Sequence, residues 1–161
     1  MQTKGRLLPT GTAAFPGASI YSRCMTIALA DPPRRPRALV LEDERLARNY
    51  LVQLIQASGL AEVVGAVATL GEARGVLAQV PVDVVFVDVQ LSAGENGLDL
   101  IRSMRADVNR PAFVLATAFS RHAPQARDLG AAEYLPKPFS EEQVERCLRR
   151  LIHPSGTASP P

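Results

Sequence analysis

Acidic residues follow two apolar runs in this chain, at the points where buried strands are expected to end. Glu42, Asp43 and Glu44 come directly after the run "ALVL", and Asp88 comes directly after "VVFV". A carboxylate at the end of a buried strand is costly unless a positive charge offsets it, and neighbouring carboxylates repel one another unless a cation lies among them. Mg²⁺ prefers oxygen ligands and often binds one or two carboxylates together with a phosphate. These residues therefore predict a site for Mg²⁺ and a phosphoryl group.

Two more residues at predicted strand ends supply groups that such a site needs. Thr117 ends the run "AFVLAT", and its hydroxyl can donate a hydrogen bond to a phosphoryl oxygen. Lys137 follows the run "EYL", and its ammonium can pair with another phosphoryl oxygen. Asp88 can itself be the nucleophile, since aspartyl carboxylates form acyl phosphates. Phosphoryl transfer depends mainly on positioning and charge neutralisation, so this small group of side chains is sufficient for it.

Each of these residues also has an ordinary structural interpretation. An aspartate after a strand, such as Asp88, usually belongs to a turn or caps a helix, and acidic residues before a helix complement its dipole. Thr117 alone reflects β propensity, and Lys137 alone is typical of a solvated loop. Four such coincidences at one edge of one sheet favour the phosphoryl site. Asp83 and Asp99 receive only the structural interpretation, because neither follows a predicted strand.

The elements that must position these side chains alternate between apolar runs and helical patterns. Such alternation is typical of βαβ units and a parallel sheet, and "VVFV" suits a central strand that is covered on both faces. We therefore expect an α/β fold, a doubly wound three-layer sandwich whose ligand site lies beyond the carboxyl ends of its strands. The predicted strands are Ala38–Leu41, Glu62–Val67, Val82–Val87, Ala112–Thr117 and Glu133–Leu135.

Local signals place the helices between these strands. Gly59 predicts the end of the first helix, and capping boxes that begin at Thr69 and Ser140 predict the starts of the second and the last. The two remaining helices are predicted over Leu98–Arg105 and His122–Leu129. The residues predicted to face inward are Ala47, Leu51, Leu54 and Ile55 in the first helix, Ala73, Val76, Leu77 and Val80 in the second, and Val144, Cys147, Leu148 and Leu151 in the last.

Composition marks the ends of the folded body. Residues 1–36 are rich in Gly, Pro, Ser and Thr and predict a flexible N-terminal arm, most of which would be missing if translation began at Met25. Residues 153–161, "HPSGTASPP", predict a disordered tail. One domain over residues 37–152 is therefore expected.

Bulk properties exclude several classes of protein. A formal net charge of +2 is too balanced to predict nucleic acid or an anionic membrane as a partner. No apolar run approaches the roughly 20 residues of a membrane-spanning helix, and "CMTIALA" is at the short limit for the apolar region of a signal peptide and unusually far from the start, so we reject it as one. Cys24 and Cys147 form no disulfide or metal pattern. We therefore expect a cytoplasmic protein with two free thiols.

Taken in order, the motifs of this chain resemble the receiver domain of bacterial two-component response regulators. The resemblance covers residues 37–152 and rests on "VLEDE", "VFVDVQ" followed by "NGLDL", "LATA" and "YLPKPF". It implies the flavodoxin-like receiver fold, with five parallel strands in the order 2-1-3-4-5. It also implies that Asp88 accepts a phosphoryl group from a sensor histidine kinase or a histidine phosphotransfer protein. Glu42 and Asp43, with Asp88 and the backbone carbonyl of Gln90, would bind the Mg²⁺ cofactor.

The resemblance further implies a switch beside this site. Thr117 and Lys137 would contact the phosphoryl group, and Tyr134 matches the aromatic switch position. The Lys137-Pro138 bond resembles the cis peptide of the family, which turns Lys137 toward the site. Phosphorylation would draw Thr117 toward the phosphoryl group while Tyr134 rotates inward, as a shift between two populations.

Three positions depart from the usual pattern of the family. Glu42 replaces the commoner aspartate, which shifts the expected position of the ion. The loop "VQLSAGENG" after Asp88 is one residue longer than usual and has Ser92 where proline is frequent. Phe119 lies two residues after Thr117, at a position that governs how water reaches the acyl phosphate, and we hypothesise that its ring slows hydrolysis.

Only a short tail follows the last predicted helix, so the sequence favours a stand-alone receiver without an effector domain. Its output would be a phosphorylation-dependent contact with a downstream protein, or a homodimer, through the last two helices and the fifth strand. The charged outer face of the last helix is equally well a solvated surface. These outer residues are Glu141, Glu142, Arg146, Arg149 and Arg150.

Two other classes stay open at this point. One is a pseudo-receiver, a binding module of the same fold that never takes phosphate, and the intact set of site residues argues against it. The other is an aspartate-nucleophile phosphohydrolase, which typically has a second carboxylate where this chain has Gln90. We expect no enzymatic activity beyond self-phosphorylation and self-dephosphorylation.

Overall fold

The computed structural model describes residues 34–118 and 123–153 of this chain. The predictions for most of the N-terminal arm and for the tail concern residues outside these ranges. Cys24, Met25 and Phe119 also lie outside the described residues, so the hypothesis about the Phe119 ring stays a prediction.

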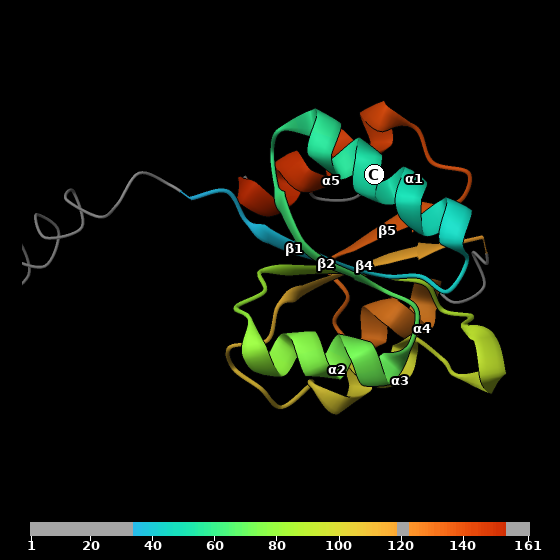
Figure 1. Ribbon diagram of the computed structural model, residues 1–161. Helices are drawn as coiled ribbons and strands as arrows, with labels where there is room; N and C mark the ends of the chain where they lie inside the picture. The colour runs from blue at the N-terminus through green and yellow to red at the C-terminus, as the bar shows by residue number, and fades with distance from the viewer. Residues whose placement is uncertain (1–33, 119–122, 154–161) are drawn as a thin grey trace, which may run out of the picture. The chain divides into compact units, whose positions relative to one another are not determined.

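A five-stranded parallel sheet forms the centre of the fold, with the strand order β2-β1-β3-β4-β5 (Figure 1). The predicted fold class and strand order are therefore confirmed. The third strand begins two residues later than predicted, because the backbone N–H of Arg37 is taken by the side chain of Asp83 at the point where a ladder bond would continue. The strands are β1 Arg37–Leu41, β2 Glu62–Val67, β3 Val84–Val87, β4 Ala112–Thr117 and β5 Glu133–Pro136.

The helices begin and end at the local signals of the sequence. Gly59 adopts a left-handed φ of 65° and ends the first helix, and both predicted capping boxes, Thr69 with Glu72 and Ser140 with Gln143, are present. The third helix ends two residues earlier than predicted because Met104 leaves helical geometry. The helices are α1 Arg45–Ser58, α2 Leu70–Gln79, α3 Leu98–Ser103, α4 Ala123–Asp128 and α5 Glu141–Ile152, with a short 3-10 turn η2 at Ser92–Gly94.

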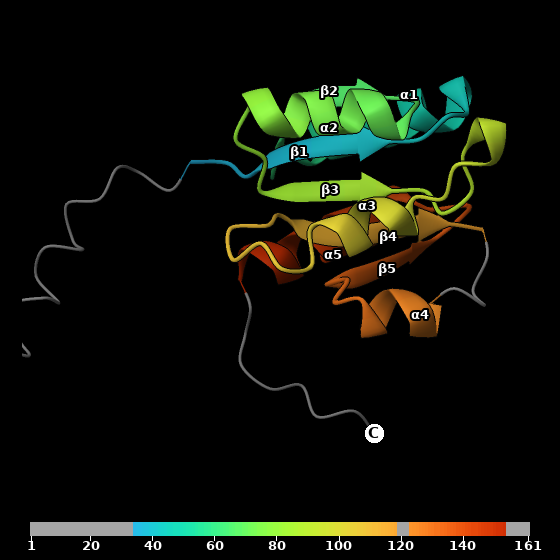
Figure 2. The same ribbon diagram turned by 90° about the horizontal axis from the view of Figure 1, so that it is seen from below.

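Helices cover both faces of the sheet, so the chain folds into three layers. Helices α1 and α5 lie on one face, and α2, α3 and α4 lie on the other (Figures 1 and 2). Successive residues of each central strand point to opposite faces: Phe86 packs with α1 and α5, whereas Val85 and Val87 pack with α2 and α3. All four residues of β3 are buried, as a central strand requires.

Two further sequence predictions concern Cys147 and membrane-spanning helices. Cys147 of α5 is a buried free thiol as predicted, and its burial raises the pKa of the thiol to about 12. Within the described part of the chain, no helix has both the length and the apolar character needed to cross a membrane.

Candidate functional site

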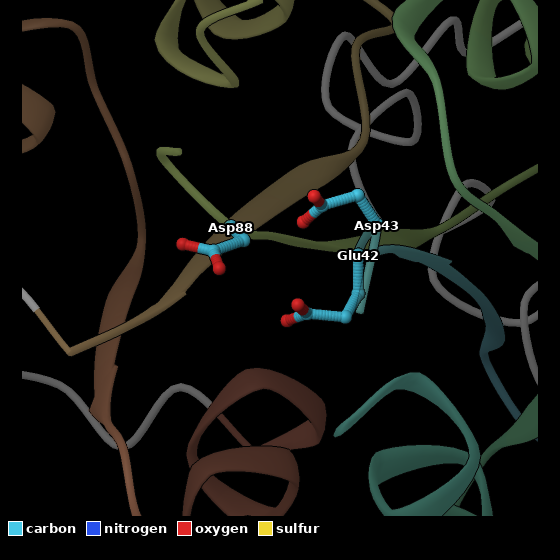
Figure 3. Close-up of side chains that lie close together, drawn as sticks. All are labelled: Glu42, Asp43 and Asp88. Carbon is cyan, nitrogen blue, oxygen red and sulfur yellow. The ribbon is translucent and has the colours of Figure 1, made fainter. Parts of the chain in front are cut away.

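Four predicted site residues meet at one edge of the sheet, because the strands that carry them are parallel. Glu42 directly follows β1, Asp88 directly follows β3, and the two strands are paired in register up to Leu41 and Val87. Thr117 is the last residue of β4, and Lys137 directly follows β5. Figure 3 shows the Glu42, Asp43 and Asp88 side chains projecting from the ends of β1 and β3 into one region.

Three carboxylates form an acidic cluster there, which we define as Glu42, Asp43 and Asp88. One oxygen from each residue lies within 4.8 Å of the others. Glu42 is only 2% exposed and Asp88 only 7%. Carboxylates held so close together repel one another, and hard oxygen donors at this spacing match the ligands that Mg²⁺ prefers. The residues present therefore fit a divalent cation.

Lys137 is the positive charge beside this cluster. Its ammonium lies 2.6 Å from Oδ2 of Asp88 and 2.5 Å from Oε2 of Glu42. The predicted cis peptide is present between Lys137 and Pro138, and the backbone N–H of Lys137 donates to the carbonyl of Thr117 at 3.0 Å. One ammonium thus pairs with two carboxylates of a cluster of three, which leaves the cluster with an excess of negative charge.

Burial and pairing act in opposite directions on these charges. Burial opposes the charge on Lys137, but its hydrogen bonds to Asp88 and Glu42 outweigh burial and raise its pKa above the ordinary value. Burial raises the pKa of Glu42, although Lys137 partly offsets the effect. The anionic form of Glu42 is therefore less stable than it would be in water, whereas Lys137 stays protonated at neutral pH.

Thr117 and Tyr134, predicted as neighbours of the phosphoryl group and of the switch, lie together in the structure. Thr117 is fully buried. Tyr134 is half-buried on the neighbouring strand β5, and its hydroxyl lies 3.5 Å from the carbonyl oxygen of Thr117. Any movement of the Thr117 backbone would therefore change the contact of the Tyr134 hydroxyl. The movement itself stays a prediction.

Arg48 is a site residue that the sequence reasoning missed. From α1, its guanidinium donates to the carbonyl oxygens of Glu42 at 2.6 Å and of Asp43 at 3.1 Å. These bonds fix the backbone of the segment that presents both carboxylates. The signal available in the sequence was an arginine one helical turn into α1, which reaches back to the loop before that helix.

The loop after Asp88 packs tightly against the site. A Cβ atom on Gly97 would lie 1.9 Å from the carbonyl oxygen of Asp88, so only glycine permits this approach. The backbone N–H of Gln90 donates to Oδ1 of Asp88 at 3.3 Å. The predicted role of the Gln90 carbonyl as a metal ligand stays a prediction. Ser92, noted in the sequence only as a departure from the usual proline, donates from Oγ to Oδ2 of Asp43.

The two aspartates given a structural interpretation keep it. Asp83 accepts a hydrogen bond from the backbone N–H of Arg37 at the opposite end of the sheet. Asp99 lies in the first turn of α3 and forms an exposed ion pair with Arg102.

Curated relatives align with most of this chain. It is 36% identical over 114 residues to the sensory transduction protein LytT of Bacillus cereus, and 33% identical over 115 residues to the transcriptional regulatory protein LytR of Staphylococcus aureus. Each alignment covers 71% of this chain but only 46% of the relative. The chain thus spans about half the length of the curated relatives that it matches.

Solved structures share the fold. The response regulatory domain of mrkE from Klebsiella pneumoniae superposes with a TM-score of 0.66 at 29% identity, over 71% of this chain and 93% of that domain. A sensor protein from Polaromonas sp. JS666 superposes with a TM-score of 0.65 at 27% identity, over 74% of this chain and 97% of that protein. The family model of the response regulator receiver domain matches residues 38–149, which include every residue of the site described above. The chain therefore belongs to the receiver domain family of two-component response regulators.

Proposed function

We propose that this protein is a phosphoacceptor of a two-component system, which takes a phosphoryl group onto Asp88 in a reaction that depends on Mg²⁺. The donor would be a sensor histidine kinase or a histidine phosphotransfer protein. One observation carries the proposal. A nearly buried aspartate at the end of a central strand lies beside an ammonium and two further carboxylates, which is an arrangement suited to an acyl phosphate.

The chemistry follows from these contacts. A carboxylate oxygen of Asp88 attacks phosphorus, an O–P bond forms, and the bond from phosphorus to the donor breaks so that the donor keeps that electron pair. The Lys137 ammonium, already 2.6 Å from Asp88, would pair with a phosphoryl oxygen once Asp88 carries the phosphoryl group. Glu42, Asp43 and Asp88 would hold Mg²⁺, with the Gln90 carbonyl as a further ligand, and the bound ion would neutralise charge on the transferring group.

The signal would leave the site through β4 and β5. We propose that Thr117 moves toward the phosphoryl group and that Tyr134 follows, and the contact between the Tyr134 hydroxyl and the Thr117 carbonyl supports this coupling. The responding surface would consist of α4, β5 and α5, which would bind a downstream protein or a second copy of the chain. The predicted outer residues of α5 are all exposed: Glu141, Glu142, Arg146, Arg149 and Arg150.

The alternatives differ in what happens at Asp88. A pseudo-receiver would take no phosphate, and the convergence of Asp88, Lys137 and the acidic cluster speaks against it. A phosphohydrolase would turn over phosphate esters, and Gln90 stands where such enzymes typically place a second carboxylate. We therefore propose a signalling protein without enzymatic activity on other substrates.

Regulation of transcription is a second candidate for the output. It is favoured by the name of the Staphylococcus aureus relative, of which this chain spans 46%. In that case the receiver would control a further part of a longer protein. Comparing DNA binding by the native full-length protein, with and without phosphorylation, distinguishes this output from a contact with a separate downstream protein.

The test is intact-mass spectrometry after incubation with acetyl phosphate and Mg²⁺. We expect a mass increase of one phosphoryl group in the wild type and in Asp99→Asn, whose aspartate lies away from the site, but none in Asp88→Asn. The increase should be lost when EDTA replaces Mg²⁺. A wild type that gains no mass would indicate a pseudo-receiver, and continuous release of phosphate from added phosphate esters would indicate a hydrolase.

A further inference from the structure

Ser92 links two loops that are far apart in the sequence. Its hydroxyl donates to Oδ2 of Asp43 at 2.5 Å, across 49 positions of the chain. Asp43 follows β1, whereas Ser92 belongs to the loop after β3, so this hydrogen bond joins the two loops that carry Asp43 and Ser92. Hydrogen bonds to a carboxylate are stronger than those between neutral groups, and this one fixes the direction of the Asp43 side chain.

The backbone around Ser92 is shaped to place the hydroxyl there. Ser92–Gly94 form a single 3-10 turn in which Ala93 adopts a φ of 60° and Gly94 a φ of 76°. A left-handed conformation is unfavourable for alanine because its Cβ atom crowds the backbone. The turn is closed by a hydrogen bond from the Glu95 N–H to the Ser92 carbonyl at 3.3 Å.

The far end of the same loop is also anchored. Oε2 of Glu95 accepts a hydrogen bond from the backbone N–H of Leu70, in the first turn of α2, at 3.0 Å. The side chain of Leu91 is buried, and the loop closes on itself through the pairing of Gln90 with Asn96. Ser92 thus meets Asp43 from a loop that is fixed on both sides of it.

We propose that Ser92 is a positioning residue for the metal ligand Asp43, and this proposal rests on the cation site proposed above. The Ser92 hydroxyl donates its hydrogen bond to Oδ2 of Asp43, so Oδ1 would be available to bind an ion. The same bond holds the carboxylate beside Glu42 and Asp88. A carboxylate that is already oriented loses less conformational freedom when a cation binds. Partners that orient metal ligands in this way typically change metal affinity about 10- to 100-fold when they are removed.

The test is direct binding of Mn²⁺, a divalent cation that also prefers oxygen ligands, measured by electron paramagnetic resonance of the free ion. We expect Ser92→Ala to weaken Mn²⁺ binding about tenfold. Ser92→Thr keeps the hydroxyl and should bind Mn²⁺ as the wild type does. Ser92→Val, whose side chain is isosteric with threonine but lacks the hydroxyl, should bind Mn²⁺ as weakly as the alanine variant. Ser103→Ala, which removes a serine hydroxyl from α3, is the matched control and should leave the affinity unchanged.

The outcomes separate this proposal from the proposed function. Equal or tighter Mn²⁺ binding in both Ser92→Ala and Ser92→Val would overturn the positioning role while Asp88 still accepts phosphate. A wild type that binds no Mn²⁺ would overturn both proposals. Urea unfolding in EDTA shows whether each variant is folded, and the threonine and valine pair gives the answer if the alanine variant is not.

Discussion

Two aspartates lie at opposite ends of the central strand β3 and meet different surroundings. Asp83, just before the strand, accepts the backbone N–H of Arg37 at 2.7 Å, and its own backbone bonds to Arg37 and Ala112 of the neighbouring strands. Asp88, just after the strand, meets the Lys137 ammonium and the carboxylates of the acidic cluster. One aspartate bonds to the backbone of the sheet, whereas the other contacts the charged groups of the proposed phosphoryl site.

The difference comes from the direction of the strands. All strands are parallel, so every chain segment enters the sheet at the Asp83 end and leaves it toward a helix at the Asp88 end. At the entry edge, polar side chains satisfy backbone groups that the ladder leaves unpaired. At the exit edge, where the strands end at their carboxyl termini, the side chains that follow several strands converge. The end of the strand, and not the residue type, decides what an aspartate does in this fold.

Replacing Lys137 by alanine should produce the largest change at the exit edge. The ammonium would no longer offset charge on the transferring phosphoryl group, so we expect phosphorylation by acetyl phosphate to slow by about 10²–10³-fold. Asp83→Asn in the same assay should phosphorylate at the wild-type rate, because its site lies at the other edge. A comparable loss in the Asp83 variant would break the distinction between the two ends.

Replacing Asp83 by alanine should mainly affect stability. The half-buried N–H of Arg37 would lose its acceptor, and we expect a loss of about 2 kcal/mol in the free energy of unfolding, measured with urea. Asp88→Ala should lose less, because Lys137 keeps Glu42 as a partner and one of three crowded carboxylates is removed. The reverse order of the two losses would show that the exit edge is the structural one.

Glu42→Gln should give the smallest change, and one of opposite sign. Burial holds the pKa of Glu42 above its ordinary value of 4.5, so the wild type loses stability as the pH rises through the folded-state pKa, and the glutamine variant does not. In EDTA at neutral pH we expect the variant to be more stable by about 1 kcal/mol. The advantage should vanish below pH 4.5, and an advantage independent of pH would contradict this explanation.

Local signals explain how much of the fold could be predicted. The bounds of β2 and β4 match the prediction, and the caps of α1, α2 and α5 form where glycine, threonine and serine indicated. Three bounds differ by one residue: β1 begins earlier, β5 ends later and α4 ends earlier than predicted. The two larger errors, of two residues each at β3 and α3, depend on non-local or terminal geometry. The Asp83 side chain displaces a ladder bond from β1, and Met104 leaves the helix although no local breaker marks it.

The sequence by itself determined which side chains reach the exit edge, because a strand end and a parallel topology are sufficient to bring Glu42, Asp88 and Lys137 together. Only the tertiary structure decided how they are held. The ammonium lies between Glu42 and Asp88, Arg48 fixes the backbone before α1, and Ser92 bonds to Asp43. Such contacts depend on side-chain rotamers and on loop dihedrals such as the positive φ of Ala93, which the periodicity of the sequence does not encode.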